Sequence, residues 1–234
     1  MKEPKVAIIT AASRGMGAAC ARELANRGYK LALMSRSTEA EDLAEELGGF
    51  GITGSVTEET DIRRLVTATL EKYGRIDAVV NNTGHPAKGE LLDIQDEDWH
   101  KGLDLLLLNV VRMSRLVTPV MELQGGGGIV NISSFTMRMP SLPMPVSSVL
   151  RAALSSFTKL YADRYARVNI RMNCILPGYV ENYEISDETR QAIPMNRPAQ
   201  LQEIARTVAF LLSEEAGYIT GQSVTVDGGL TRSY

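Results

Sequence analysis

Short runs of apolar residues alternate along this chain with longer segments in which apolar positions recur at helical spacing. Each apolar run ends in a polar or glycine-containing turn, which is the pattern of repeated strand-helix-strand units around a parallel sheet. The pattern predicts strands near residues 5–9, 30–34, 51–53, 78–81, 128–132, 169–175 and 223–226. The clearest predicted helices cover 15–27, 58–72, 96–122, 147–166 and 201–213. We therefore predict an α/β fold with a doubly wound sheet of seven parallel strands between two helical layers.

The predicted domain is single and spans residues 1–234, because this length suits one large core better than two. Residues 179–200 are the only long irregular stretch, rich in polar residues and prolines, and we expect them to form a substrate lid. In a doubly wound sheet, ligands bind beyond the carboxyl ends of the strands. Residues that directly follow strands are therefore the first candidates for a site.

Composition narrows the function classes mainly by exclusion. The formal net charge is only -3 and no basic block occurs, so we expect no nucleic-acid partner. Two cysteines and two histidines lack the spacing of metal ligands, which argues against a metal site or a disulfide framework and fits a reducing cytoplasm. No apolar run is long enough to target or span a membrane. A small-molecule substrate is the expected partner.

The turn after the first predicted strand reads Thr10-Ala11-Ala12-Ser13-Arg14-Gly15-Met16-Gly17 and opens a helix. Backbone N–H groups at a helix N-terminus can face a pyrophosphate, and Gly15 and Gly17 allow its close approach. The predicted cofactor contacts in this turn are Thr10, Ser13, Arg14, Gly15, Met16 and Gly17.

The residues after the second predicted strand, Ser35, Arg36 and Ser37, face the adenosine ribose in such a fold. A basic residue there pairs with a 2′-phosphate, whereas an acidic residue binds the free diol, and no acidic residue stands at this point. Arg14 is a second basic candidate for the phosphate. The cofactor predicted is NADP(H). The alternative is that both guanidinium groups are solvated surface charges.

Further motifs follow in a fixed order: Asn81-Asn82-Thr83-Gly84, Asn109, Ile132-Ser133-Ser134, Pro177-Gly178 and Val226-Asp227-Gly228-Gly229. Together with the first turn they resemble the short-chain dehydrogenase/reductase family over essentially the whole chain. The resemblance implies a Rossmann-type domain that transfers hydride through a nicotinamide cofactor. It also implies cofactor contacts at Ser55, Val56, Asn82, Gly84, Arg151, Pro177, Gly178 and Val180. Two departures are Ala11 for the first glycine and Ser55 for an aspartate beside the adenine.

The resemblance also locates the catalytic residues, and here the chain departs most. In the family a serine is followed after thirteen residues by a tyrosine and after four more by a lysine. Ser134 fits the serine, and the same count gives Ser147 and Arg151. An aliphatic hydroxyl is a far poorer acid than a phenol. Arg151 could hold the ribose, stabilise an alkoxide or clamp a carboxylate, and the i, i+4 spacing predicts that both side chains point at the same ligand.

The proton donor therefore needs a substitute. His85 is the best candidate because it follows the fourth predicted strand and titrates in the useful range, whereas Tyr179 and Tyr183 in the lid are weaker ones. The alternative for His85 is a loop histidine bonded to backbone. The resemblance places Asn109 in a proton relay, and a buried amide that satisfies the core is the alternative.

Two functions follow as hypotheses. The first is an atypical NADP(H)-dependent oxidoreductase acting on a small carbonyl or alcohol; Arg151, Arg138 and three nearby methionines hint at an anionic substrate. The second is a noncatalytic NADP(H)-binding subunit or sensor, and a lyase or isomerase is a third option. By analogy with the family, the helices predicted at 96–122 and 147–166 would pair copies of the chain into a homodimer or homotetramer.

Overall fold

The computed structural model of the protein describes residues 3–232. Within this range seven parallel strands form one sheet in the order β3-β2-β1-β4-β5-β6-β7. Their bounds are β1 Val6–Thr10, β2 Lys30–Ser35, β3 Phe50–Thr53, β4 Ala78–Asn81, β5 Gly127–Ile132, β6 Ile170–Pro177 and β7 Ser223–Val226. The chain reverses its direction across the sheet between β1 and β4, which is the switch point where doubly wound folds bind ligands.

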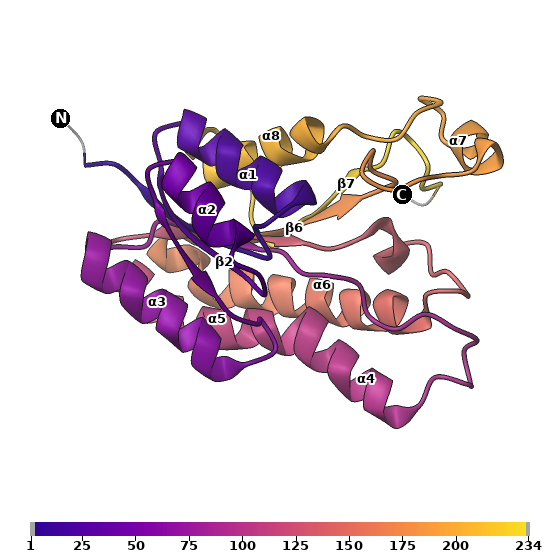
Figure 1. The fold of residues 1–234 in the computed structure, drawn as a ribbon, viewed down its shortest axis with the longest axis horizontal. Helices are drawn as coiled ribbons and strands as arrows, with labels where there is room; N and C mark the ends of the chain where they lie inside the picture. The colour runs from indigo at the N-terminus through magenta and orange to yellow at the C-terminus, as the bar shows by residue number, and fades with distance from the viewer. Residues whose placement is uncertain (1–2, 233–234) are drawn as a thin grey trace.

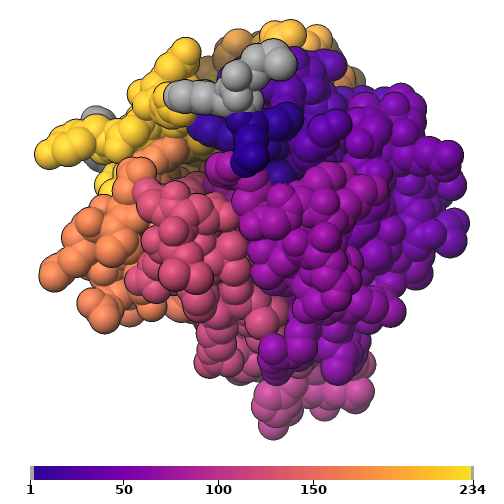
Figure 2. Space-filling model, turned by 90° about the vertical axis from the view of Figure 1, so that its left-hand side faces the viewer, coloured from indigo at the N-terminus to yellow at the C-terminus, as the bar shows by residue number. Residues whose placement is uncertain are grey.

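Helices cover both faces of the sheet (Figure 1). One layer holds α1 Gly15–Asn26, α2 Glu39–Glu46 and α8 Leu201–Leu212. The other holds α3 Glu59–Tyr73, α5 Asn109–Leu123 and α6 Pro145–Tyr165, with α4 Asp96–Leu103 beside them and the short α7 Asp187–Ala192 beyond the sheet. The predicted three-layer, single-domain α/β fold is confirmed. Figure 2 shows the two layers as one continuous body, from whose lower end α4 projects.

The packing of the core explains why the strands could be predicted from short apolar runs in the sequence. All five residues of β1 are buried, because helices lie on both faces of the sheet. Side chains alternate between the faces of a strand. Ala7 and Ile9 accordingly pack with residues of α1 and α8, whereas Ile8 packs in a second cluster with residues of α3 and α5. The sheet is thus fixed from both sides.

Three details differ from the prediction. The helix expected over 96–122 consists of α4 and α5, joined by a π-helical turn at Asp104–Leu108. The apolar pattern runs through this turn without a break, so periodicity alone could not reveal it. Residues 179–200 include α7 and a parallel bridge between Val180 and Ala199. They are not the only long irregular stretch, since residues 82–95 contain neither helix nor strand.

The loops that follow β4, β5 and β6 emerge at the same end of the sheet, on the right-hand side of Figure 1. They carry the polar segments 82–95, 133–144 and 178–186. Parallel strands impose this arrangement, because all their carboxyl ends share one edge. Residues far apart in the sequence can therefore meet there.

Candidate cofactor and substrate site

The turn between β1 and α1 is tightly folded around two special positions. Ala11 has φ +46°, in the left-handed region that normally selects glycine, and Gly15 has φ +57°. A Cβ on Gly17 would lie 2.3 Å from the carbonyl oxygen of Ala11, so only glycine fits. Ala11 thus adopts a backbone conformation for which glycine is the usual residue.

Thr10 and Asn82 fix this turn to the loop after β4. The Thr10 hydroxyl donates to the carbonyl of Asn82 at 2.7 Å and accepts from the Asn82 N–H at 3.0 Å. The Asn82 amide donates to the carbonyl of Ala11 at 3.1 Å. Both side chains are buried, so their first role is to hold the turn in shape. Their assignment as cofactor contacts stays a prediction.

The amino end of α1 fits an anionic group. Arg14 occupies the N-cap position without a side-chain hydrogen bond to the helix, and the first turn contains no acidic residue. The backbone N–H groups and the positive dipole end of α1 therefore meet no carboxylate within that turn that would compete with a bound anion. Asn182, in the segment after β6, lies over the turn, because its amide nitrogen would be 3.3 Å from a Cβ on Gly15.

Arg14 and Arg36 are both exposed, and neither side chain makes a hydrogen bond or ion pair within residues 3–232. The Ala12 N–H donates to the carbonyl of Met34 at 3.1 Å, which joins the first turn to the end of β2. One acidic group escaped the prediction: Glu39 accepts a hydrogen bond from the Ser37 hydroxyl at 3.1 Å. Glu39 also lines, with Ser13, a surface hollow between α1 and α2. Glu39, three residues after Arg36 in the sequence, is an acidic competitor that the prediction did not include.

The loop after β3 has an acidic neighbour as well. Asp61 of α3 accepts a hydrogen bond from the Ser55 N–H at 2.9 Å, and the Ser55 hydroxyl is turned to Thr57 at 2.8 Å. A carboxylate thus stands beside the position where the family has an aspartate, although it comes from the first turn of the following helix, six residues later. The Val56 side chain packs against the core cluster on that side of the sheet.

The predicted wall after β6 is formed partly by packing. The Gly178 N–H donates to the carbonyl of Val226 at 3.0 Å, and a Cβ on Gly178 would lie 2.8 Å from that of Asp227. Pro177 pairs with Val226 at the end of the sheet. The Val180 side chain is buried in the core, so only its backbone is left to face a ligand. Gly84, across the switch point, has open space around it.

Ser134, Ser147 and Arg151 lie close together but do not all face outward. Ser134 caps a 3-10 turn by accepting from the Thr136 N–H at 3.2 Å, and the Thr136 hydroxyl lies 3.4 Å from that of Ser147. Arg151 donates from Nε to the Ser147 hydroxyl at 3.1 Å and from Nη1 to the carbonyl of Ile132 at 3.0 Å. Burial lowers the pKa of Arg151 to about 10, while Cys174 and Tyr183 act in the opposite direction.

The i, i+4 prediction holds for the shared helix face, whereas a common ligand for the two side chains stays a prediction. Ser147 and Arg151 do share a helix face, but each is at least nine-tenths buried and they bond to each other. The reason is that a buried guanidinium needs acceptors, and the nearest are a hydroxyl one turn away and the carboxyl end of β5. Thr136, which completes this chain of hydroxyl groups, was not predicted.

His85 and Tyr183 meet across the end of the sheet. The Nε2 atom of His85 lies 2.9 Å from the Tyr183 hydroxyl, and the two rings contact edge to face with centroids 5.3 Å apart. Partial desolvation lowers the pKa of His85, and the charges of Arg151 and Lys88 lower it further. The bond to backbone considered for His85 is thus replaced by one to the Tyr183 side chain, in the segment after β6.

Asn109 stands at the first residue of α5, directly after the π-helical turn. Its amide nitrogen donates to the carbonyl of Leu105 at 2.8 Å, while its Oδ1 atom is buried without a partner in residues 3–232. An unsatisfied buried oxygen of this kind is able to accept from a water or a ligand. The relay role of Asn109 stays a prediction.

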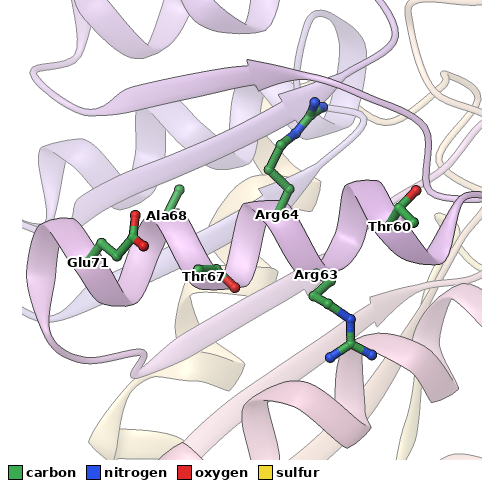
Figure 3. A pocket seen from close by; sticks show the side chains of 6 residues that line it. All are labelled: Thr60, Arg63, Arg64, Thr67, Ala68 and Glu71. Atoms are coloured by element: carbon green, nitrogen blue, oxygen red, sulfur yellow. The ribbon is translucent and has the colours of Figure 1, made fainter.

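A hollow outside this region runs along α3 (Figure 3). All the side chains that line it come from one helix, and Arg63 and Arg64 point away from each other. Arg63 is paired with Glu59 and Arg64 with Asp61. A single helix face with its charges already paired does not enclose a ligand, so we assign no site there.

Two further features of residues 3–232 bear on the class of site. They contain no group of His, Cys, Asp or Glu side chains arranged to hold a metal ion. None of their helices combines the length and apolar character needed to cross a membrane. The uncapped helix behind a glycine turn, at the switch point of a doubly wound sheet, defines instead a dinucleotide-binding α/β protein.

Comparison with known proteins agrees with this class. The family model described as enoyl-(acyl carrier protein) reductase matches residues 10–231. Dehydrogenase/reductase SDR family member 4 of Pongo abelii is 34% identical over 96% of this chain and 87% of its own length. Oxidoreductase UcpA of Salmonella typhimurium is 36% identical over 97% and 94%. A crystal structure described as YwfH, an NADPH dependent reductase involved in bacilysin biosynthesis, aligns with a TM-score of 0.94 at 26% identity, over 99% of this chain and 100% of that one.

The chain belongs to the short-chain dehydrogenase/reductase family. It is an oxidoreductase of that type, with the fold and the glycine turn with which the family binds a nicotinamide cofactor.

Proposed function

We propose that this oxidoreductase uses NADP(H) and transfers hydride to or from a small carbonyl or alcohol. The observation that carries the proposal is the pair of exposed guanidinium groups, Arg14 and Arg36, beside the uncapped amino end of α1. A guanidinium suits the 2′-phosphate better than a free diol. The description of the structural neighbour as an NADPH dependent reductase supports the same choice.

The chain's own residues would divide the work as follows. The N–H groups at the start of α1 would hold the pyrophosphate, and Arg36 and Arg14 would hold the 2′-phosphate. Pro177 and Gly178 would form the wall beside the nicotinamide. When bound, the reduced cofactor supplies a hydride. Ser134 orients the substrate oxygen, and the buried positive charge of Arg151 stabilises negative charge that develops nearby. We propose that Ser147 and Arg151 stand in place of the family's tyrosine and lysine, so that the proton must come from another group.

We propose further that the substrate is a small molecule, with an anionic group as one option, and that copies of the chain assemble into a homodimer or homotetramer. A reducing cytoplasm is the proposed location, which the two free, buried cysteines suit. No nucleic-acid or membrane partner is proposed.

A noncatalytic NADP(H)-binding subunit or sensor is the second candidate, and one observation favours it. Two nitrogens of Arg151 and the hydroxyl of Ser147 are already engaged inside the protein. Residues committed to the fold in this way are poorly placed to act on a substrate. The two candidates share the cofactor site and differ only in turnover.

An equilibrium titration of cofactor-free protein with NADPH and NADH, followed by nicotinamide fluorescence, tests the cofactor proposal. We expect NADPH to bind more tightly, and Arg36→Ala to weaken NADPH by about tenfold with little effect on NADH, because only NADPH carries the phosphate. Glu39→Gln should raise the affinity for NADPH, because it removes a negative charge beside Ser37 that would repel the 2′-phosphate. Equal affinities, or an Arg36→Ala variant that loses both cofactors alike, would contradict NADP(H) preference. Binding without turnover of any carbonyl would favour the sensor.

A further inference from the structure

The hydrogen-bonded pair of His85 and Tyr183 joins two segments that are 98 residues apart in the chain. His85 follows the Asn-Asn-Thr-Gly motif beyond β4, and Tyr183 lies in the lid beyond β6. The Tyr183 side chain is about half exposed, at 46%, although its hydroxyl is only 2.9 Å from the imidazole. Tyr183 thus presents a phenolic hydroxyl, bonded to an imidazole and open to solvent, at the edge of the sheet where ligands bind. The proposed cofactor contacts do not include this pair.

Arg151 connects this pair to the predicted catalytic residues. Desolvation is the largest cause of the lowered pKa of His85, and the charge of Arg151 is the second, ahead of that of Lys88. Tyr183 in turn acts to raise the pKa of Arg151, against the effect of burial. The three groups, from α6, the loop after β4 and the lid, therefore lie within electrostatic reach of one another.

We propose that Tyr183 donates the proton to the substrate oxygen and that His85 returns a proton to Tyr183 from solvent. The inference rests on the hydride transfer proposed above and supplies the acid that Ser147 cannot provide. Tyr183 is then a catalytic residue that touches the reacting oxygen. His85 acts through it and is a relay and positioning residue.

The step balances as follows in the direction of reduction. The carbonyl carbon receives the hydride and its electron pair, the C=O π bond breaks, and the oxygen takes the proton from the Tyr183 hydroxyl. The resulting phenolate regains a proton from Nε2 of His85, and Nδ1 of His85 takes one from water. The products are the alcohol, the oxidised cofactor and a hydroxide that neutralises one solvent proton. A neutral imidazole can do this because it carries one N–H and one lone pair.

The other hydroxyl groups of the region are less suited to the task. Ser147 is buried and bonded to Arg151, and the Thr136 side chain is fully buried. Tyr161 is bonded to Thr118 within the core, where burial raises its pKa to about 12. The Tyr179 ring packs against Phe135 in an apolar cluster. Tyr183 alone among these combines exposure with a titratable partner.

A matched pair of substitutions in the lid tests the proposal. NADPH-dependent reduction of para-nitrobenzaldehyde and para-carboxybenzaldehyde is followed by loss of the reduced nicotinamide signal in wild type, Tyr183→Phe and Tyr179→Phe. We expect Tyr183→Phe to reduce kcat by about a hundredfold, the lower range for loss of a general acid, while Tyr179→Phe stays within about twofold of wild type. The NADPH affinity of both variants should equal that of wild type, which shows that the cofactor site is intact.

His85→Gln separates a relay from a purely structural contact. Glutamine can still hydrogen-bond the Tyr183 hydroxyl but has no group that titrates near neutral pH. We expect the variant to lose the step in the pH profile of kcat that His85 causes. The groups that face His85 and shape this step are Arg151, Lys88 and Tyr183. An unchanged pH profile in His85→Gln would overturn the relay.

A measurement without turnover completes the design. The chain has two histidines, so His85→Gln identifies the imidazole NMR signal of His85. Its titration should change in Tyr183→Phe and not in Tyr179→Phe. If wild type reduces either aldehyde and Tyr183→Phe is equally fast, the inference is wrong and the proposed function stands. If wild type binds NADPH but reduces neither aldehyde, hydride transfer itself is wrong, and the proton donor falls with it.

Discussion

Ala11 shows how a single residue can depart from a motif and keep its geometry. Its φ of +46° lies where a side chain costs roughly 1–2 kcal/mol, yet the turn still forms and accepts the hydrogen bond from Asn82. The strain is borne by contacts elsewhere in the turn, since Gly17 packs directly on the Ala11 carbonyl. The substitution therefore affects stability more than shape.

Replacing Ala11 by glycine tests this strain. We expect Ala11→Gly to raise the free energy of unfolding by about 0.5–1 kcal/mol, because relief of the left-handed strain exceeds the entropy that glycine adds to the unfolded chain. Urea denaturation of cofactor-free protein measures it. Ala12→Gly, at a buried neighbour outside the left-handed region, is the control and should lower stability by about 1 kcal/mol. A destabilised Ala11→Gly variant would contradict the argument.

At the scale of elements, α8 begins with a compact set of polar contacts. Glu203 accepts from the Gln200 N–H at 2.8 Å and from two nitrogens of Arg197 at 2.8 and 2.7 Å, which forms a capping box with a paired guanidinium. These contacts, the Arg197 bond first and then the Gln200 bond, lower the pKa of Glu203 to about 2. They fix where α8 starts and hence how it packs on α1.

The lowered pKa makes this start of α8 sensitive to acid. Because the folded pKa lies below the ordinary value, the stabilisation is complete above about pH 4.5 and is lost as the pH falls toward 2. We expect Glu203→Gln to be less stable than wild type by at most about 1 kcal/mol at pH 6, since the pair is partly exposed. Denaturation at pH 6 and pH 3 should show the difference shrinking with acid. If the difference in stability between wild type and Glu203→Gln grows as the pH falls, the predicted direction of the pH dependence is wrong.

At the scale of the whole molecule, one buried polar network ties three strands to a helix. Asn81 of β4 donates to Asn131 of β5 at 2.9 Å, and Asn131 donates to Thr158 of α6 at 3.1 Å. The Thr158 hydroxyl in turn lies 3.2 Å from the sulfur of Cys174 in β6. The network crosses the sheet near the ends of β4, β5 and β6, so it sets the position from which the loops after these strands leave.

Removing the centre of this network should be costly. Asn131→Ala is expected to lower the free energy of unfolding by about 2–3 kcal/mol, because it leaves buried donors and acceptors on both sides without partners. Thr158→Val, which keeps the shape and removes one hydroxyl, should cost about 1 kcal/mol. Urea denaturation of both variants gives the comparison. If both variants lower the free energy of unfolding equally and only slightly, packing rather than the hydrogen-bond network stabilises these elements.

Local pattern made much of this molecule readable from its sequence. The seven strands follow from short apolar runs that must be buried on both faces, and the glycine turn follows from the need for close backbone approach. Gly17 is the clearest case, since a Cβ there would collide with backbone. The count from Ser134 to Arg151 likewise selected three residues that the structure places close together. Each of these inferences depends on positions close together in the chain.

The tertiary structure decided what depends on long-range contact. Periodicity placed Ser147 and Arg151 on one face, but only packing against β5 turned them toward each other. His85 and Tyr183 meet where loops 98 residues apart converge, whereas Glu39 beside Ser37 and Asp61 beside Ser55 are contacts between residues two and six positions apart. The sequence by itself thus determined the family fold and the glycine turn. Only the packing of the loops decided that His85 meets Tyr183, because side-chain partners across a sheet edge leave no spacing signal in the chain.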